Sequence, residues 1–461
     1  MHAPLSNNQE GRIILCHGCF DVLHLGHIRH LQEAAALGDR LVVSITSDEH
    51  AAHKGPGRPH FGEQHRREQL LALECVDEVV ISRERTAVAA INHVRPAVYV
   101  KGADYAGTTD PDLAAERAAV EALGGRMHIT SSEKWSSTLL LRNARLSDQA
   151  KAYLEGARAR GFLEEIMAAF ERADGLDVVF VGDRIVDEYR YVRPLAKPSK
   201  EFVLATLAAG DERFEGGVVA AGKHGEWARA RTLTTARAVT KTRFVDADFA
   251  RKLFETYSAR AIETTEADRR EIREGIEVAA AADVVVAYDF GHGFFERGDR
   301  TALLRRAKFL AVTAQTNAGN CGFNSAERWK GCDLVCVDEP EARIAVGDRD
   351  APVDSLARQL MSITRIGNGA VMVTCGRLGS VAHSQRAETT QVPAFTDGGI
   401  DTMGAGDAFL ALAAPLLAAG LDAEKAAFVG NIAGGLKTSI LGHRGHVGRA
   451  DLVKNIEWLL K

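Results

Sequence analysis

The chain contains short, almost uninterrupted apolar runs that are separated by stretches with helical spacing. In the first third of the chain these runs are Ile13–Cys16, Arg40–Thr46, Asp77–Ser82 and Ala97–Val100. Such runs are typical of strands buried on both faces of a parallel sheet. Ligands of these sheets bind beyond the carboxyl ends of the strands, so the residues that follow each run are the candidate site residues.

The same alternation returns in the rest of the chain, with apolar runs at Leu176–Asp183, Asp283–Asp289, Phe309–Thr313, Leu334–Val337 and Ala370–Thr374. We therefore predict an α/β fold with two doubly wound parallel-sheet domains, over residues 1–142 and 176–461. Residues 143–175 are rich in Ala, Glu and Arg and predict a helical connector. Residues 187–246 alternate polar and apolar side chains, which predicts antiparallel strands of a small lid and a surface for a homodimer.

Composition excludes several classes of function. The 57 Lys and Arg against 62 Asp and Glu give a net charge of -5, which provides no general attraction for nucleic acid or an anionic membrane. No apolar run is long enough to span a bilayer, and the first ten residues lack the features of a signal peptide. The seven scattered cysteines favour reduced thiols. We expect a cytoplasmic protein without a nucleic-acid or membrane partner.

Two histidines, His24 and His27, lie where the first apolar run turns into the helix predicted over Ile28–Leu37. Free backbone N–H groups and the helix dipole favour an anion at this place. Imidazole groups there can donate hydrogen bonds to phosphate oxygens and stabilise charge in a transition state. Gly26 allows the backbone to approach a ligand closely.

A metal or redox site is the alternative interpretation of this stretch. Cys16 and Cys19 form a Cys-x-x-Cys pair, and His17 and His30 are close in sequence. Against it, no second ligand pair follows at a suitable spacing, and Cys16 falls inside the predicted strand.

The stretch Gly18–His27 resembles the signature of the cytidylyltransferase-like nucleotidyltransferases. The resemblance implies that His24 and His27 contact a triphosphate during catalysis. It also implies nucleotide or phosphate contacts for Gly18, Phe20 and Asp21.

Further segments, Lys54–Pro59, Arg66, Lys101–Tyr105 and Trp135–Thr138, recur in this order in the adenylyltransferase domain of the bifunctional ADP-heptose synthases. This resemblance covers about residues 11–142. It implies that Lys101 assists catalysis and that the remaining contacts to nucleotide or phosphate come from Lys54, Arg66, Asp104, Ser136, Ser137 and Thr138. Each basic residue taken alone is more often a solvated surface charge.

Near the end of the chain, small residues open a predicted helix in the stretch Asp401–Phe409. The N–H groups of Gly404, Ala405 and Gly406 can bind the anion of a transferring phosphoryl group. Asp407, at the helix start, can accept the proton of an acceptor hydroxyl. The alternative is a flexible turn before a core helix.

The stretch Asp401–Phe409 resembles the signature of the ribokinase-like (PfkB-type) sugar kinases, and the resemblance covers about residues 176–455. It implies that Glu341 helps to hold Mg²⁺ through water. It implies sugar contacts for Asp183, Asp187, Gly216 and Gly217, and ATP contacts for Thr374, Gly376, Gly379 and Asn431.

The acceptor side departs from this pattern. Glu215–Ala220 does not lead to the asparagine that touches the sugar in the family, and Asp289–Gly293 has His292 where heptose kinases usually carry a lysine. Their Asp-Pro-Lys element is replaced by Gln315–Asn320. The usual ADP-heptose synthase also has its kinase first, whereas this chain has its transferase first.

The combined resemblance predicts a bifunctional enzyme that phosphorylates a sugar or a sugar phosphate at the anomeric hydroxyl and joins a sugar 1-phosphate to ATP or CTP. By resemblance the acceptor is D-glycero-D-manno-heptose 7-phosphate and the product is ADP-heptose. Two alternatives stay open. The transferase half can be a cytidylyltransferase for another sugar or polyol phosphate, because the histidine motif does not read the base. The second half can be a degenerate kinase that serves as a sugar sensor or a dimerisation module.

Overall fold

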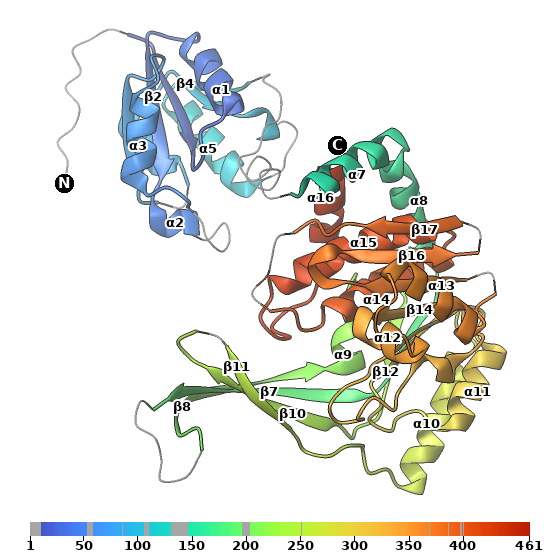
Figure 1. The fold of residues 1–461 in the computed structure, drawn as a ribbon. Coiled ribbons are helices and arrows are strands. Elements are labelled where there is room, and N and C mark those ends of the chain that lie inside the picture. Colours follow the sequence, from blue (N-terminus) through green and yellow to red (C-terminus); the bar gives the residue numbers. More distant parts are fainter. Residues whose placement is uncertain are drawn as a thin grey trace. The chain divides into compact units, whose positions relative to one another are not determined.

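The structure is a computed structural model that describes residues 11–52, 59–84, 86–105, 110–130, 146–195, 203–249, 251–367, 369–385, 387–396, 399 and 401–461. The chain divides into two units, Met1–Ala144 and Arg145–Lys461 (Figure 1). Each unit has its own sheet and its own hydrophobic core.

The first unit is built on a parallel five-stranded sheet in the order β3-β2-β1-β4-β5. The strands follow the apolar runs of the sequence: β1 (Ile13–Gly18), β2 (Arg40–Thr46), β3 (Glu78–Ser82), β4 (Val98–Lys101) and β5 (Arg126–Ile129). The central strand β1 pairs with β2 and β4, so its carboxyl end opens in the middle of the sheet edge.

Helices cover both faces of this sheet. Successive strand residues point to opposite faces, so Ile14 and Leu15 of β1 belong to different core clusters. Leu31 and Leu70 join the cluster of Ile14, and Ile91 joins that of Leu15. The helices of the unit are α1 (Leu25–Ala35), α2 (Asp48–Ala52), α3 (Glu63–Leu71), α4 (Val88–Val94) and α5 (Pro111–Ala122), with the 3-10 turn η1 (Ala103–Tyr105).

The main sheet of the second unit has the order β17-β16-β15-β14-β13-β12-β6-β9. The pairs from β9 to β15 are parallel, and β16 and β17 add an antiparallel edge. The strands are β6 (Val178–Gly182), β9 (Ala230–Leu233), β12 (Val284–Asp289), β13 (Leu310–Ala314), β14 (Leu334–Asp338), β15 (Ala370–Thr374), β16 (Ser380–Ser384) and β17 (Ala387–Val392).

Two helical layers enclose this sheet. One core cluster contains residues of α7 (Asp148–Ala159), α8 (Phe162–Asp174), α9 (Gly217–Ala221), α14 (Ala405–Ala418), α15 (Ala423–Thr438) and α16 (Arg449–Leu460). The other contains residues of α10 (Glu266–Ala279), α11 (Arg297–Arg306), α12 (Glu339–Val346) and α13 (Val353–Thr364), and the turns η2 (Ala326–Trp329) and η3 (Gly376–Leu378) lie between elements. The range 143–175, predicted as a connector, thus supplies α7 and α8, whose apolar faces pack in the core of the second unit.

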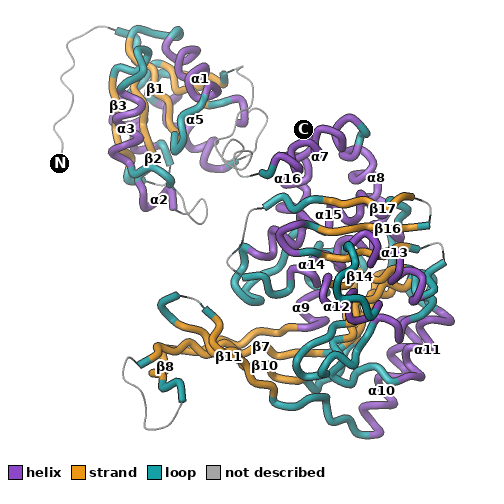
Figure 2. The backbone as a smooth tube through the Cα atoms, in the orientation of Figure 1, coloured by secondary structure: helices purple, strands orange, loops and turns teal. Residues whose placement is uncertain are grey.

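A second sheet projects from these layers, in the order β11-β10-β7-β8 (Figure 2). It consists of β7 (Arg184–Pro194), β8 (Thr206–Gly216), β10 (Val239–Asp246) and β11 (Lys252–Tyr257). The sequence predicted antiparallel strands, and the pairs β7–β8 and β10–β11 are antiparallel, but β7 and β10 run parallel. The reason is that the chain passes through α9 and β9 after β8, and this crossover returns β10 in the direction of β7.

In the described part of the chain, no helix combines the length and the apolar character that crossing a bilayer requires.

Candidate active sites

The turn after β1 presents two stacked imidazole rings at the start of α1. His24 is the N-cap residue, and its Nδ1 atom accepts a hydrogen bond from the N–H of His27 at 3.3 Å. The ring centroids of His24 and His27 are 3.8 Å apart with an angle of 18° between the planes. Because Nδ1 of His24 accepts, the neutral ring carries its proton on Nε2.

Both rings have a nitrogen left over for a ligand. Nε2 of His24 and Nδ1 of His27 are buried and have no hydrogen-bond partner among the described residues. Burial, together with smaller contributions from the neighbouring His24 and His30, lowers the pKa of His27 to about 3. Burial also lowers the pKa of His24. A bound anion would raise both pKa values, because its negative charge stabilises the protonated imidazole, and this suits a site that binds a polyphosphate.

Two other predicted residues of this unit, Phe20 and Asp21, form contacts within the fold. Phe20 lies two residues after Gly18, the last residue of β1, and packs edge-on against His27 with ring centroids 5.1 Å apart. Asp21 accepts hydrogen bonds from the N–H groups of His60 and Phe61, at 2.6 and 3.0 Å. Asp21 therefore anchors the segment that precedes α3.

Arg66 is fully buried and joins the loops at the carboxyl ends of β1 and β2. Its guanidinium donates to the carbonyl oxygens of Cys19 at 2.6 Å, Thr46 at 2.9 Å and Phe61 at 2.9 Å. It also pairs with Asp48 at 2.7 Å. The resemblance implies a phosphate contact for this residue, whereas in the structure its guanidinium group holds these loops together next to the site.

Lys101 is the last residue of β4, at the carboxyl end of the strand, but its ammonium group is paired inside the unit. Nζ lies 3.0 Å from Oε2 of Glu116 in α5, and the side chains are 6% and 5% exposed. The same carboxylate accepts hydrogen bonds from the hydroxyl of Tyr99 at 2.9 Å and the N–H of Ala87 at 3.0 Å. A phosphate contact of Lys101 therefore has to compete with Glu116.

Several predicted residues of this unit, Lys54, Ser136, Ser137, Thr138 and the side chain of Asp104, lie outside the described residues. Within the described ranges, no group of three or more His, Cys, Asp or Glu side chains is arranged to hold a metal ion. Cys16 is fully buried, and burial raises the pKa of its thiol, so it does not fit a reactive dithiol.

In the second unit, a cavity of about 670 Å³ opens at the carboxyl ends of the parallel strands. Its walls include residues that directly follow β13, β14 and β15, together with the start of α14. The predicted residues that line it are Asp187, Gly217, Glu341, Thr374, Gly376, Gly379, Gly404, Ala405, Gly406, Asp407 and Asn431.

The start of α14 has the geometry predicted for an anion site. Gly404 is the N-cap residue with φ of +71°, in the left-handed region that favours glycine. Ala405, Gly406 and Asp407 form the first turn, where backbone N–H groups have no helical partner. The pKa of Asp407 is raised to about 6, because the effect of burial exceeds the opposing effect of His443, Lys241 and Lys437.

Two carboxylates meet at the start of α12. Asp338 and Glu341 form a capping box, in which each side chain accepts the backbone N–H of the other, at 2.8 and 3.0 Å. Burial and Asp338 raise the pKa of Glu341 to about 8. Among the described residues neither carboxylate has a cationic partner, so the pair fits a hydrated Mg²⁺ ion, a hard cation that prefers oxygen ligands and keeps several waters.

The residues that are predicted to contact ATP come from separate elements. Thr374 ends β15, Gly376 begins η3, and Gly379 directly follows it. Asn431, in α15, donates from Nδ2 to the carbonyl oxygens of Val392 at 2.9 Å and Pro393 at 3.2 Å. This bond fixes the end of β17 against the helix.

The predicted sugar contacts divide into two groups. Asp187 and Gly217 line the cavity, whereas Asp183 and Gly216 do not. Asp183 is fully buried and accepts the N–H groups of Phe290 at 2.9 Å and Phe294 at 3.0 Å. A side chain at position 216 would meet Oδ2 of Asp187, because a Cβ built there lies 2.1 Å from it.

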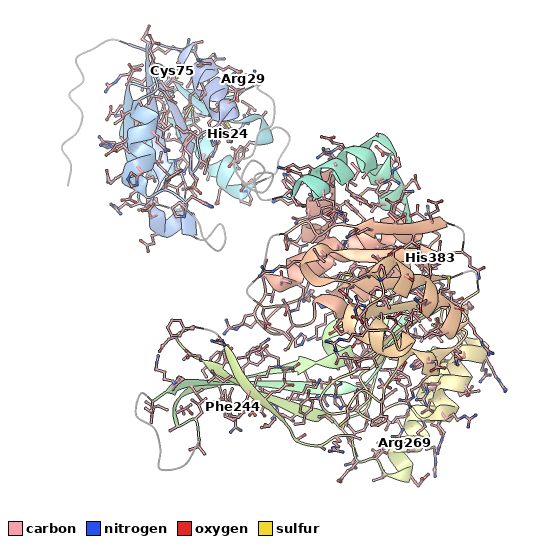
Figure 3. All side chains as sticks on the ribbon, viewed as in Figure 1. His24, Arg29, Cys75, Phe244, Arg269 and His383 are labelled. Atoms are coloured by element: carbon pink, nitrogen blue, oxygen red, sulfur yellow. The ribbon has the colours of Figure 1, made fainter. Side chains whose placement is uncertain are left out.

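The loop 290–294 is also held from the other side. Arg269, which is labelled in Figure 3, lies in α10 and donates to the carbonyl oxygens of Gly293 and Phe294. Asp289 accepts hydrogen bonds from Trp329 and Asn324, both at 3.0 Å. His292 is fully buried. The motif that departs from the heptose kinases is thus a tightly bonded loop, and of its residues Phe290 lines the cavity.

Sequence reasoning missed four cationic or potentially cationic side chains in the cavity: Lys241, Arg243, Arg377 and His443. Arg243 of β10 pairs with Asp187, and Nε2 of His443 lies 3.2 Å from Oδ2 of the same carboxylate. Burial favours the neutral form of Asp187, but the bonds from His443 and Arg243 lower its pKa. The alternation in β10, which points Lys241 and Arg243 to one face, is the signal that could have found two of them.

Comparisons with known proteins match the two parts of the chain to two different families. Residues 15–143 match the family described as cytidylyltransferase-like, and residues 316–444 match the pfkB family of carbohydrate kinases. The Bifunctional protein HldE of Pelobacter propionicus is 42% identical over 128 residues, which are 28% of this chain and 25% of that protein. The protein of the same name from Koribacter versatilis is 46% identical over 134 residues, 29% of this chain and 27% of that protein.

The aligned part spans about a quarter of the length of these curated relatives. A crystal structure of a phosphofructokinase-2 mutant from Escherichia coli, 12% identical, covers 62% of this chain and 100% of that chain with a TM-score of 0.50. This likeness concerns the fold and confirms the predicted fold class for the second unit. The first part of the chain is therefore similar to cytidylyltransferase-like proteins and a later part to pfkB-type carbohydrate kinases, in agreement with the expected transferase class.

Proposed function

We propose that this chain is a bifunctional cytoplasmic enzyme, a sugar kinase and a sugar-1-phosphate nucleotidyltransferase, that serves the synthesis of ADP-heptose. The acceptor of the kinase half is D-glycero-D-manno-heptose 7-phosphate, and the acceptor of the transferase half is the heptose 1-phosphate. Support comes from the resemblance to the bifunctional ADP-heptose synthases and from relatives named Bifunctional protein HldE.

The observation that carries the kinase part is the convergence of Asp407, the start of α14 and the Asp338–Glu341 pair on one cavity. A base, an anion site and a place for a divalent cation are what phosphoryl transfer requires. The likeness of this half to pfkB-type kinases adds the substrate class, a carbohydrate.

In the kinase reaction, Asp407 accepts the proton of the acceptor hydroxyl, whose oxygen then attacks the γ-phosphorus of ATP. The bond from this phosphorus to the β–γ bridging oxygen breaks, and ADP leaves. The N–H groups at the start of α14 hold the oxygens of the transferring group. Bound Mg²⁺, held by Asp338 and Glu341 through water, would neutralise phosphate charge.

In the transferase reaction, a phosphate oxygen of the sugar 1-phosphate attacks the α-phosphorus of ATP, and pyrophosphate leaves. His24 and His27 hold phosphate oxygens and stabilise the charge that develops on them. Little covalent work is required of the protein, because positioning and electrostatic stabilisation supply the acceleration. The phosphate at C7 has no counterpart in ADP-heptose, so a phosphomonoester hydrolase must act between the two steps.

Two assays on the purified chain test this proposal. Heptose 7-phosphate with ATP should yield ADP, and heptose 1-phosphate with ATP should yield pyrophosphate. The proposal fails if neither sugar phosphate is turned over with ATP or CTP.

The acceptor side supports a second candidate. Asp187 is already bonded to Arg243 and His443, and the loop 290–294 is fixed by Asp183 and Arg269. Such a pocket also suits another sugar phosphate, joined to CTP by the first half. Pyrophosphate release with CTP and none with ATP would select this candidate. A kinase half without catalysis would be recognised by turnover of the whole enzyme that is unchanged in Asp407→Asn.

A further inference from the structure

Lys437 carries a buried ammonium group behind the anion site of the second unit. It lies in the last turn of α15, and its side chain is fully buried. Nζ donates to the carbonyl oxygens of Met403 at 3.0 Å and Gly442 at 2.6 Å. No carboxylate of the described residues forms a salt bridge with it, so backbone carbonyls alone bind this cation.

The two carbonyl groups belong to the two loops that form one end of the cavity. Met403 directly precedes Gly404, the N-cap residue of α14, and Gly442 directly precedes His443. Met403, Gly404 and His443 line the cavity, whereas Lys437 is not among the lining residues. A Cβ built on Gly404 would lie 3.3 Å from Cε of Lys437. The ammonium group thus lies directly behind the site, out of reach of a substrate.

Asp401 completes the connection between these loops. Its carboxylate accepts the N–H of Met403 at 3.2 Å and that of Gly442 at 3.0 Å. Lys437 therefore binds the carbonyl oxygens, and Asp401 the N–H groups, of the same two residues. An ammonium ion offers three donors and no acceptor, which matches a place where carbonyl oxygens converge.

Burying an ammonium group without a carboxylate partner is costly, because the charge loses its hydration. Accordingly, burial lowers the pKa of Lys437, and the negative charges of Asp401, Asp407 and Asp187 oppose this shift. A methionine would fill the same space without the penalty. The buried charge is therefore expected to have a function, and stabilising an anion at the adjacent start of α14 is such a function.

We propose that Lys437 is a built-in monovalent cation that positions the start of α14 and adds positive charge behind the transferring phosphoryl group. Lys437 is a positioning residue, since it acts through Met403 and Gly442. The kinase half then needs no free potassium or ammonium ion. This inference rests on the proposed phosphoryl transfer at Asp407.

Cation rescue tests the proposal. Kinase rates of the full chain are measured in choline, sodium, potassium and ammonium chloride at one ionic strength. The wild-type rate should be the same in all four salts. Lys437→Ala leaves a space for an ion, so its rate should fall by about 100-fold in choline, as for removal of one anion-hole donor. Expressed as activation free energy, potassium or ammonium should restore at least about a tenth of this loss. A loss of stability alone would not produce a recovery that depends on the cation.

Two variants serve as controls. Lys437→Met fills the space, so it should lose activity and not respond to any cation. Lys425→Ala removes another lysine of α15, which pairs with Glu165 at 2.7 Å and Asp422 at 2.6 Å. Its rate should not depend on the cation either, which separates a specific site from a general effect on the helix.

Thermal unfolding gives a readout that does not need turnover. Potassium should raise the unfolding midpoint of Lys437→Ala relative to choline and leave that of the wild type unchanged. If this pattern holds while no sugar phosphate is turned over, the proposed function fails and the cation site stands. Stimulation of the wild type by potassium, wild-type activity in Lys437→Ala, or a folded Lys437→Ala that no cation restores would each overturn the inference. Should Lys437→Ala not fold, the salt response of the wild type decides alone.

Discussion

Nε2 of His443 lies 3.2 Å from Oδ2 of Asp187, and this contact connects the acceptor side of the kinase cavity with its anion site. Nδ1 of the same ring is buried and has no hydrogen-bond partner among the described residues. A Cβ built on Gly404 would lie 3.7 Å from this Nδ1 atom. Because a carboxylate only accepts, Nε2 carries a proton, and Nδ1 faces the place where the phosphoryl group is expected.

His443→Leu should therefore lower the kcat of the kinase half by about 100-fold, the usual effect of losing one preorganised donor or positioning contact. His443→Gln should retain part of the activity, because its amide can still donate to Asp187. The matched control is His446→Gln, in the same loop, whose ring pairs with Glu226 at 3.1 Å. Steady-state ADP formation measures the effect, and an unchanged kcat in His443→Leu would contradict the assigned position.

Asp407 should set the acid limb of the kinase pH profile. Its pKa is raised to about 6, chiefly by burial. A general base works only when it is deprotonated, so the rate should fall about tenfold per pH unit below this value. Asp407→Asn should abolish ADP formation and leave pyrophosphate release by the first unit intact. If Asp407→Asn still formed ADP with an unchanged acid limb, this limb would belong to another group.

His24 and His27 should be required by the transferase half alone. His27→Asn removes the ring that stacks on His24 at 3.8 Å and should lower pyrophosphate release by about 100-fold or more. ADP formation by the second unit should stay within experimental error. Arg29→Gln, an exposed change in the same helix, is the control. Loss of both activities in His27→Asn would indicate a folding defect and would remove the argument for a local role.

Sequence patterns were sufficient where the chemistry is local. His24 lies at the start of α1, and the small residues before Asp407 open α14, as the sequence predicted, because neighbouring residues build both helix starts. The spacing of Asp338 and Glu341 likewise produced a capping box. Motifs of this kind need only the secondary structure to be predicted correctly.

The same patterns were insufficient where the partner is far away in the chain. Arg66 and Lys101 look like phosphate ligands in the sequence, but Arg66 binds Cys19 and Thr46, and Lys101 binds Glu116. His443 and Lys437 gave no signal, since their importance comes from packing against Asp187 and Met403. The spacing of residues in the sequence does not predict tertiary contacts of this kind.

The first unit should lose stability in mild acid. Burial lowers the pKa of His30 to about 4 and that of His27 to about 3, from an ordinary value of 6.5. The unfolded chain therefore takes up protons first as the pH falls below 6.5, so the stabilisation is complete above that pH. It should decline towards pH 4 by up to about 1.4 kcal/mol per pH unit for each histidine.

Amide hydrogen exchange of β1 at pH 7 and pH 5 measures this loss for the first unit alone. His30→Asn, which can keep a bond to Thr130, should show a smaller difference between the two pH values. His93→Asn, on the exposed side of α4, should behave like the wild type. Equal pH dependence in all three proteins would contradict the assignment.

The projecting sheet β7, β8, β10 and β11 should mediate a homodimer. Large apolar side chains are exposed on it and beside it, including Leu204 (55%), Leu207 (60%) and Phe249 (82%). Covering such a patch is favourable in proportion to its area. Sedimentation velocity should show a dimer for the wild type and a monomer for Leu207→Asp, with Ile344→Asp in α12 as the control. A monomeric wild type would contradict this prediction.

The most direct test of the two-site account is a phosphorus NMR time course on the purified full chain with Mg²⁺, ATP, heptose 7-phosphate and heptose 1-phosphate. The account predicts two sets of products in one sample: ADP with a heptose phosphorylated at C1 and C7, and pyrophosphate with ADP-heptose. Formation of neither set, with both sugar phosphates and ATP left unchanged, would contradict it.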